Sequence, residues 1–281
     1  MQIRRLMTVE EFHQVYELER EIWGYTTTED SVPVPIMIVS AEIGGLLLGA
    51  FEPDATADRM VGFAYALPGV KDGKAFQWSH MLGVTEAHRN SGLGWRLKLE
   101  QRRLVLESGL DLIKWTYDPL QALNAHLNFV KLGVVAREYH ENVYGDSSSP
   151  LHVGTPTDRF IAEWWLESER VAQRLAAAER GEGRPGDIGD AAAVNLVSHL
   201  PCVEWIAPGK ADLSVDALRL AVTIPMGFTE MQQQNLPLAQ EWRATTREIF
   251  TTYLPRGYEV VDFVLDRPGR RGTYLLERTK V

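Results

Sequence analysis

One stretch of this sequence, from Phe76 to Gly94, limits the possible folds more than any other: FQWSHMLGVTEAHRNSGLG. Met81, Leu82 and Val84 are apolar and lie just before a turn that contains Gly92, and WRLKLEQRRLVLES then has the apolar spacing of an amphipathic helix. The first N–H groups of a helix lack intrahelical acceptors and lie at the positive end of its dipole, so they favour an anion. Glycine lets the backbone approach that anion closely, and Arg89 adds a positive charge.

Two common phosphate-binding patterns do not fit this turn. It contains no G-x-x-x-x-G-K-[ST], and no third glycine completes G-x-G-x-x-G. An ordinary connection between a strand and a helix also carries glycine at such positions. The turn alone therefore leaves both an anion site and a plain connection open.

The spacing Arg89-x-x-Gly92-x-Gly94 after an apolar strand resembles the pyrophosphate-binding motif of the GNAT superfamily of acyl-CoA N-acyltransferases. The resemblance implies that backbone amides from about Asn90 to Trp95 hold the CoA pyrophosphate, while the end of the strand pairs with the pantetheine arm. It implies acetyl-CoA or another acyl-CoA as cosubstrate, and no metal. The cofactor-binding residues expected on this basis are Leu82, Gly83, Val84, Arg89, Asn90, Ser91, Gly92, Leu93, Gly94, Trp95, Asn124 and Phe129.

The elements before this stretch come in an order that agrees with the resemblance. Residues 46–51 and 60–67 predict two strands, which lead through the Asp72–Gly73 turn into the strand at 76–84. This meander after two predicted helices is the GNAT order. We therefore expect an α+β fold with a central, mostly antiparallel sheet flanked by helices.

The loop between the first two predicted helices lies over the acceptor site in folds of this kind. Trp23, Tyr25 and Asp30 could line that site here, although packing or surface roles explain them equally well.

A later helix, predicted from Gln121 to Leu132 and closed by Gly133, resembles the GNAT segment that packs beside CoA. Many of these enzymes carry a tyrosine four residues before the glycine, as the acid that protonates the leaving thiolate. This chain has Phe129 there, which cannot donate a proton. Either water or another group would then protonate the leaving thiolate, or the thiolate would leave without protonation.

His80 is the candidate catalytic residue. In the resembling family a base often lies on the strand before the glycine turn, and His80 shares the parity of Leu82 and Val84 on that strand. Histidine titrates in the useful pH range, so His80 could be a general base or hold a water molecule. A buried structural histidine is an equally open interpretation.

The length of 281 residues allows more than one compact core. The segment ERGEGRPGDIGDA is rich in glycine and charge and has no apolar period, which favours a domain boundary. We expect a GNAT-like domain at 1–180, a linker at 181–198 and a small α+β domain at 199–281. The last has a strand–helix–strand–strand pattern and could act as a lid or a dimerisation unit.

Within this last domain, Arg243 and Arg247 lie four residues apart on a predicted helix. Two guanidinium groups on one helix face could clamp a carboxylate of the substrate. The alternative is a solvated face on which they pair with Glu241 or Glu248.

The net charge of −9 argues against a nucleic-acid partner, because nucleic-acid surfaces favour a basic patch. The single cysteine, Cys202, fits a reducing compartment and a structural thiol. The sequence shows no signal peptide and no membrane-spanning run, so we expect a cytoplasmic protein that could form a homodimer.

Together these features predict an N-acyltransferase that moves an acetyl or other short acyl group from acyl-CoA to a small-molecule amine. The acyl group could be succinyl, and the acceptor could be an amino acid if the arginine pair binds its carboxylate. The alternative is a GNAT-like module that binds acyl-CoA as a sensor without turnover, which Phe129 keeps open.

Overall fold

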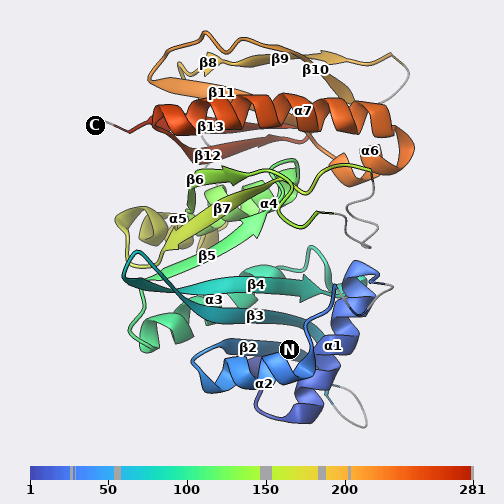
Figure 1. Ribbon diagram of the computed structural model, residues 1–281, viewed down its shortest axis with the longest axis vertical. Helices are drawn as coiled ribbons and strands as arrows, with labels where there is room; N and C mark the ends of the chain where they lie inside the picture. Colours follow the sequence, from blue (N-terminus) through green and yellow to red (C-terminus); the bar gives the residue numbers. More distant parts are fainter. Residues whose placement is uncertain are drawn as a thin grey trace. The chain divides into compact units, whose positions relative to one another are not determined.

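The computed structural model describes residues 1–25, 28, 30–53, 58–145, 154–182, 188–201 and 204–279. Contacts within the chain divide it into two compact units, with the boundary between Trp115 and Thr116 (Figure 1). Among the described residues, no helix is both long enough and apolar enough to cross a membrane.

The first unit holds a sheet in the strand order β1-β2-β3-β4-β5. Its elements in chain order are β1 (Gln2–Arg5), α1 (Val9–Trp23), α2 (Val34–Glu42), β2 (Leu46–Glu52), β3 (Arg59–Lys71), β4 (Lys74–Val84), a 3₁₀ turn (Glu86–His88), α3 (Leu93–Glu107) and β5 (Leu112–Tyr117), whose last residues pass into the second unit. The meander expected from the sequence is confirmed, because β2, β3 and β4 pair consecutively and antiparallel. β4 and β5 pair in parallel.

The second unit holds a sheet in the order β7-β6-β12-β13-β11-β8, and β9 pairs with β10 in a separate sheet. Its elements are α4 (Ala122–Ala125), a π-helix (His126–Leu132), β6 (Val135–His140), β7 (Arg159–Trp165), α5 (Glu169–Glu179), β8 (Ala192–Ala193), β9 (Asn195–His199), β10 (Ile206–Ala211), β11 (Arg219–Pro225), α6 (Phe228–Gln234), α7 (Leu236–Tyr253), a 3₁₀ turn (Leu254–Arg256), β12 (Tyr258–Asp266) and β13 (Arg271–Arg278). The expected α+β class is confirmed, and β11, α7, β12 and β13 form the expected strand–helix–strand–strand order. β8, β9, β10 and α6 were not anticipated.

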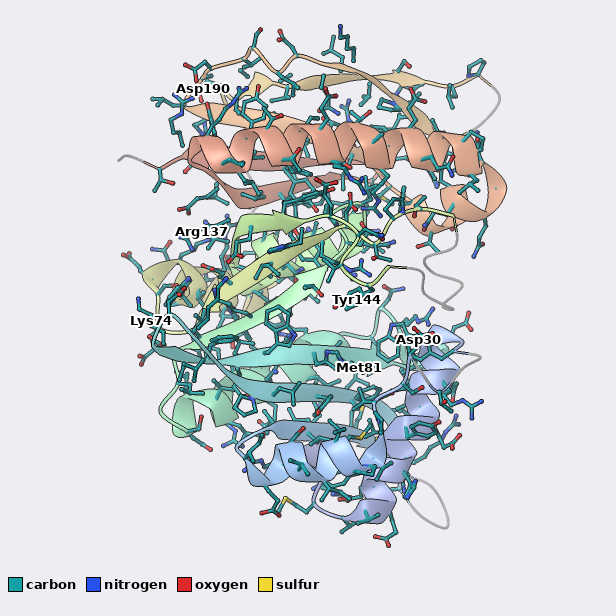
Figure 2. All side chains as sticks on the ribbon, in the orientation of Figure 1. Asp30, Lys74, Met81, Arg137, Tyr144 and Asp190 are labelled. Atoms are coloured by element: carbon teal, nitrogen blue, oxygen red, sulfur yellow. The ribbon has the colours of Figure 1, made fainter. Side chains whose placement is uncertain are left out.

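Residues on both sides of the predicted linker 181–198 share one sheet in the second unit. Val260 of β12 pairs with Ala136 of β6. Arg137 of β6, labelled in Figure 2, forms an ion pair with Glu163 of β7 and a second one, at 2.7 Å, with Glu259 of β12. The division into domains at 1–180 and 199–281 therefore stays a prediction, while the contacts divide the chain near residue 115. Cys202 lies outside the described residues.

The helix predicted at 121–132 is present but is wider than expected over most of its length. After one α-helical turn, residues 126–132 form a π-helix. The N–H of Gly133, whose φ is 74°, donates to the carbonyl of Asn128, five residues back, and closes the helix. π-Helical turns occur often at functional sites, and no sequence pattern predicted this one.

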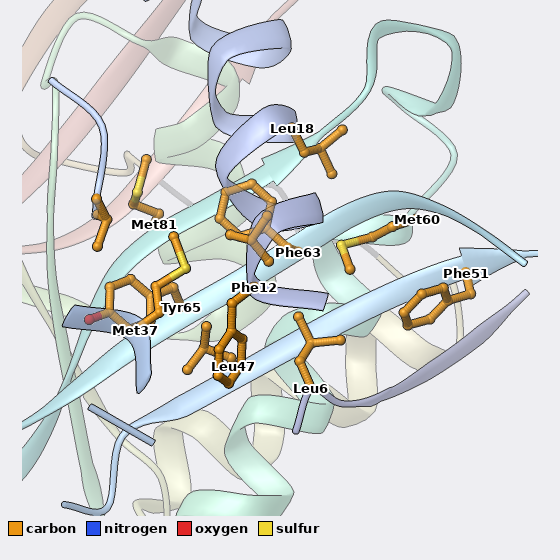
Figure 3. Packing of buried hydrophobic residues seen from close by; sticks show 12 residues of the cluster. Leu6, Phe12, Leu18, Met37, Leu47, Phe51, Met60, Phe63, Tyr65 and Met81 are labelled. Atoms are coloured by element: carbon orange, nitrogen blue, oxygen red, sulfur yellow. The ribbon is translucent and has the colours of Figure 1, made fainter. Parts of the chain in front are cut away.

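The core of the first unit lies between the sheet and the two N-terminal helices (Figure 3). Its buried side chains come from α1, α2 and the central strands: Phe12, Val15, Leu18, Met37, Leu47, Phe63, Tyr65 and Met81. On β4, Met81 faces this core, whereas Ser79 hydrogen bonds with two side chains of α3. Met81 and Ser79 face opposite sides although they lie two residues apart, because a β-bulge between them interrupts the alternation of side chains. α1 and α2 therefore cover one face of the sheet and α3 covers the other.

Candidate functional site

The turn between β4 and α3 leaves backbone N–H groups without acceptors. Gly92 is the N-cap of α3 with a φ of 83°, and no side chain caps this helix. The first helical hydrogen bond runs from the N–H of Arg96 to the carbonyl of Gly92, at 3.1 Å. The N–H groups before it in the helix have no intrahelical acceptor. Asn90 also has a positive φ, of 61°, and such turns direct successive N–H groups to one side, as in anion-binding loops.

The space in front of this turn is open. A Cβ added at Gly92 would meet no atom within 4 Å. Arg89 is exposed and forms no ion pair with a described residue. Ser91 Oγ donates to the carbonyl of His88 at 2.6 Å, and Leu93, 2 % exposed, anchors the first turn of α3. The seven residues expected to bind CoA between Arg89 and Trp95 thus share one open, positively charged turn.

β4 loses its neighbour on one side before it ends. Its ladder with β5 ends at the pair Trp78 and Lys114, whereas its ladder with β3 continues to Val84. Among the described residues of the first unit, the backbone groups of residues 79–84 that face the β5 side have no strand partner. Free N–H and C=O groups along a strand edge can pair with an extended ligand that carries amide groups. The expected pantetheine-binding residues, 82–84, lie on this edge.

Gly83 on this edge is required by close packing. A Cβ there would lie 2.8 Å from a side-chain atom of Ile22 and 2.9 Å from one of Trp23. The end of α1 therefore rests directly against the backbone of β4. This contact brings the helix that precedes the predicted acceptor loop to the strand that carries the candidate base.

A β-bulge places His80 on β4. Tyr65 of β3 pairs with Met81, and Ala66 pairs with Ser79, so His80 is the extra residue between them. Its ring meets the Tyr65 ring edge-on with 5.8 Å between the centroids. His80 retains exposed surface, but the protein surrounds much of the imidazole, and this desolvation lowers its pKa. A neutral imidazole at pH 7 can accept a proton.

Glu19, which was not among the residues expected from the sequence, lies on the core face of α1 and is 0 % exposed. Its Oε2 accepts a hydrogen bond from the N–H of Val32 at 2.9 Å, while its Oε1 has no partner. Burial raises the pKa of Glu19 to about 7, although the Val32 hydrogen bond acts against this. The spacing of Phe12, Val15 and Glu19 was the available signal, because it puts a carboxylate where the helix needs an apolar residue.

Polar side chains near Glu19 come from the other elements that pack against α1. The Tyr65 hydroxyl lies 2.6 Å from Ser40 Oγ of α2, and the negative charge of Glu19 contributes to raising the pKa of Tyr65, mainly raised by burial. Ser31, next to Val32 in the loop after α1, is 6 % exposed, and its hydroxyl has no partner. Among the described residues Glu19 forms no ion pair, and its pKa is shifted by burial and the Val32 hydrogen bond without a contribution from a cation.

A second unpaired charge, Lys98 of α3, is buried against the opposite face of the sheet. Its Nζ donates to Ser79 Oγ at 2.8 Å and to Gln101 Oε1 at 3.2 Å, and it lies 3.9 Å from the centre of the Trp115 ring. The lysine is 4 % exposed and no carboxylate of the described residues lies within ion-pair distance. Burial lowers the pKa of Lys98 to about 7.

Asn124 and Phe129 belong to the second unit, separately from the turn. Asn124 is exposed at the start of the helix. Phe129 is 0 % exposed, and its ring packs edge-on against Tyr117 and Tyr274 with centroids 6.2 and 5.8 Å apart. Phe129 therefore serves the aromatic core of this unit, and its position offers no proton donor.

Arg243, one of the two residues expected to clamp a substrate carboxylate, already holds a carboxylate of the chain. Its Nη1 and Nη2 donate to the two oxygens of Asp118 at 2.9 and 2.6 Å, and Arg243 is 2 % exposed. Burial alone would raise the pKa of Asp118, but the charge and hydrogen bonds of Arg243 outweigh it and hold that pKa below its usual value. This bidentate pair is built into the interior of the second unit.

Arg247 is occupied in the same way. Its Nε and Nη2 donate to Asp158 at 2.9 and 2.6 Å, and its Nη1 lies 3.1 Å from Glu141. Asp158 is 0 % exposed and also accepts a 2.6 Å hydrogen bond from Tyr139. Neither Glu241 nor Glu248 is the partner, so both interpretations of this helix face missed the internal carboxylates.

A shallow groove of about 450 Å³ elsewhere in the first unit does not coincide with the turn. It is lined partly by Glu10, Glu17 and Glu21 on the solvent side of α1 and by Asp58. Four carboxylates would repel the phosphates of CoA. The groove therefore plays no part in the candidate site.

No family model and no curated protein matches this chain. Solved structures similar in fold include a GNAT-family protein from Desulfovibrio desulfuricans, with 18 % identity and a TM-score of 0.45, covering 59 % of this chain and 98 % of the other. They also include the ribosomal-protein-S18-alanine N-acetyltransferase from Escherichia coli, with 15 % identity and a TM-score of 0.46, covering 59 % of this chain and 94 % of the other. A third is aminoglycoside 6'-acetyltransferase type Ii, with 20 % identity and a TM-score of 0.45, covering 60 % of this chain and 99 % of the other. The solved structures that this chain resembles thus include GNAT acetyltransferases, over about three fifths of its length.

Proposed function

We propose that this protein binds an acyl-CoA at the β4–α3 turn and transfers its short acyl group to an amine of a small molecule. The observation that carries the proposal is the uncapped N-terminus of α3, which opens through Gly92 onto free space beside the exposed Arg89. Backbone N–H groups, a helix dipole and a guanidinium together suit a pyrophosphate.

The unpaired side of β4 supports the same ligand. Pantetheine carries two amide groups along an extended arm, and residues 79–84 offer backbone donors and acceptors along an edge that leads into the turn. The thioester would then lie near the bulge at His80, where a backbone N–H can polarise its carbonyl.

The chemistry needs little more than positioning and proton transfer. The neutral amine attacks the thioester carbon, the new C–N bond forms as the C–S bond breaks, and CoA leaves as a thiolate. His80, which its lowered pKa keeps neutral at pH 7, is the proposed base or water-holding group. Since Phe129 cannot supply a proton, the thiolate takes its proton from solvent.

The amino-acid acceptor considered above loses its basis, because Asp118 and Asp158 occupy the arginine pair. The acyl group remains a short one, acetyl or succinyl, and the test compares both.

The test is isothermal titration of the protein with acetyl-CoA, succinyl-CoA and CoA, repeated with Gly92→Glu. Wild type should bind, and the variant should not, because its carboxylate would occupy the turn and repel the phosphates. Gly109→Glu is the matched control, since Gly109 is exposed, has a φ of 82° and likewise has no atom within 4 Å of an added Cβ. Gly92→Ala adds the backbone strain of a side chain at positive φ without adding a charge, so its binding shows how much of the loss in Gly92→Glu comes from strain. If wild type binds none of the three ligands, the proposal is wrong.

Phe129 favours a second candidate, an acyl-CoA-binding sensor without turnover, because this aromatic position offers no acid for the leaving thiolate. A protein that binds acetyl-CoA but releases no free thiol with any primary amine would support the sensor. Steady thiol release that depends on the amine would reject it.

A further inference from the structure

Glu19 and the loop residues beside it form a buried polar site that binding of CoA at the turn does not use. One oxygen of the carboxylate accepts from the N–H of Val32, and the other has no partner. The hydroxyl of the neighbouring Ser31 is also buried without a partner. Buried polar atoms without partners are uncommon in folded proteins, so the unpaired oxygen of Glu19 and that of Ser31, the residue before Val32, indicate that hydrogen-bonding partners are missing.

The chemistry of this site fits a cation. A carboxylate and a serine oxygen both accept hydrogen bonds, and an ammonium group offers three donors and no acceptor. Trp23, at the end of α1, packs edge-on against Phe63 with ring centroids 5.8 Å apart, so aromatic surface lies on the same helix. Aromatic faces and a carboxylate together favour a positively charged amine.

Glu19 also lies beside the strand that carries the proposed reaction. The contact between α1 and β4 at Gly83 brings this helix against the strand edge. Tyr65, whose pKa responds to the charge of Glu19, touches the ring of His80 at the bulge. The carboxylate and the proposed base therefore belong to one polar cluster on the α1–α2 face of the sheet.

We propose that Glu19 recognises the ammonium group of the acceptor and receives its proton, directly or through one bridging water, before the amine attacks the thioester; this rests on the proposed acyl transfer. The proton moves from R–NH₃⁺ to the carboxylate, which leaves R–NH₂ and a neutral acid. The amine then forms the C–N bond and the C–S bond breaks. The second N–H proton passes to His80 or its water, and the thiolate takes a proton from solvent. Glu19 and His80 then release their protons, so R–NH₃⁺ and acyl-CoA give amide, CoA thiol and one proton to solvent.

This assignment specifies the class of acceptor. An amine whose neighbouring carbon carries a carboxylate would bring a second negative charge beside Glu19. No described residue forms an ion pair with Glu19 that could compensate this charge. Like charges at such a place oppose binding. The acceptor is therefore a primary amine without an adjacent carboxylate.

The acid–base behaviour agrees with this role. Burial raises the pKa of Glu19 to about 7, so its carboxylate forms as the pH rises through neutrality. Of the groups on the packed elements, Tyr65 of β3 lies close enough for the charge of Glu19 to help raise its pKa, and Tyr65 remains neutral because burial also raises that pKa. Tyr65 in turn contacts Ser40 of α2 and the ring of His80 of β4. His80 titrates lower, since burial lowers its pKa, so a His80→Gln variant separates the two contributions.

The experiment compares amines with the amino acids that differ from them only by the carboxylate: tyramine with tyrosine, and cadaverine with lysine. Thiol release from acetyl-CoA gives kcat/KM for each. We expect at least one amine to exceed its amino acid by about tenfold or more. Glu19→Gln should lower kcat/KM for that amine by about 100-fold and remove the limb of the pH profile near 7, while acetyl-CoA binding by titration stays unchanged.

Controls distinguish a catalytic role from a folding role. Glu21→Gln changes an exposed glutamate of the same helix and should leave both kcat/KM and acetyl-CoA binding unchanged. Ser31→Ala should raise KM for the amine without changing the melting temperature. If Glu19→Gln does not fold, the Ser31 variant and the amine-to-amino-acid ratio still decide the outcome.

Two results would overturn the inference while acyl-CoA binding stands. One is a wild type that binds acetyl-CoA but acylates tyrosine or lysine at the α-amine as well as the matched amine. The other is a wild type that binds acetyl-CoA and acylates none of the four compounds. Absence of acetyl-CoA binding would instead reject the proposed function itself.

Discussion

The two units of this protein bury charged side chains in opposite ways. In the second unit, Arg243 pairs with Asp118 in a bidentate geometry, and Asp158 pairs with Arg247. In the first unit, Glu19 and Lys98 are buried with only neutral hydrogen-bond partners among the described residues. The buried charged side chains of the second unit thus stay ionised in pairs. Burial shifts the pKa of Glu19 and of Lys98 in the first unit so that their neutral forms are favoured.

This difference separates structural from functional burial. A buried ion pair satisfies both partners, so it fixes the packing of the elements that carry it. A single buried charge costs stability unless it changes protonation or meets a ligand, and such perturbed groups occur often at functional sites. Glu19 and Lys98 lie on opposite faces of the sheet near the unpaired part of β4, which is where the proposed site lies.

The largest effect is expected on breaking the pair in the second unit. Asp118→Asn removes the charge that compensates Arg243, and it should lower the free energy of unfolding in urea by about 3–5 kcal/mol. Asp190→Asn is the matched control, because its pair with Arg219, at 2.6 Å, joins a carboxylate that is 87 % exposed, and stability should not change. Figure 2 labels Asp190. Equal effects of the two variants would contradict the assignment of the buried pair as structural.

A gain in stability is expected when the unpaired cation of the first unit is replaced. Lys98→Met keeps a long side chain against the Trp115 ring and removes the buried amine, so the free energy of unfolding at pH 7 should rise by about 1–3 kcal/mol. Denaturant unfolding of the purified variant measures this. A loss of stability would show that the hydrogen bonds to Ser79 and Gln101 outweigh the cost of burying the amine.

The smallest effect, measured per pH unit, is expected as a pair of opposite pH slopes from the first unit. Glu19 has a native pKa raised to about 7, so it stabilises the fold at low pH, and that contribution is lost as the pH rises from 4.5 to about 7. Lys98 has a native pKa lowered to about 7, so its penalty is largest below 7 and is relieved as the pH rises toward 10.5. Each should contribute a slope of up to about 1.4 kcal/mol per pH unit within its window.

The two variants assign these slopes. Glu19→Gln should flatten the unfolding free energy between pH 4.5 and 7, and Lys98→Met should flatten it between 7 and 10.5, each leaving the other window unchanged. Unfolding in urea at a series of pH values tests this. If the unfolding free energy of both variants keeps both slopes against pH, the assignment of the slopes to Glu19 and Lys98 is wrong.

Local sequence patterns determined most of the first unit. The meander and the turn with Gly92 each depend on residues close together in the chain, so their spacing predicted the elements and the open helix N-terminus. The resemblance in Arg89-x-x-Gly92-x-Gly94 depends on the same local geometry. His80 could be placed on its strand but not at the bulge, because the bulge depends on register with β3.

The sequence by itself therefore determined the order of the strands in the first unit, the turn with Gly92 and the amphipathic helices, since these follow from neighbouring residues. The tertiary structure alone decided how the charges pair: Asp118 meets Arg243 and Asp158 meets Arg247 across long separations in the chain, which no spacing rule predicts. It also decided that Glu19 and Lys98 have no counter-ion among the residues that the structure describes, because burial and partners arise only when distant elements pack.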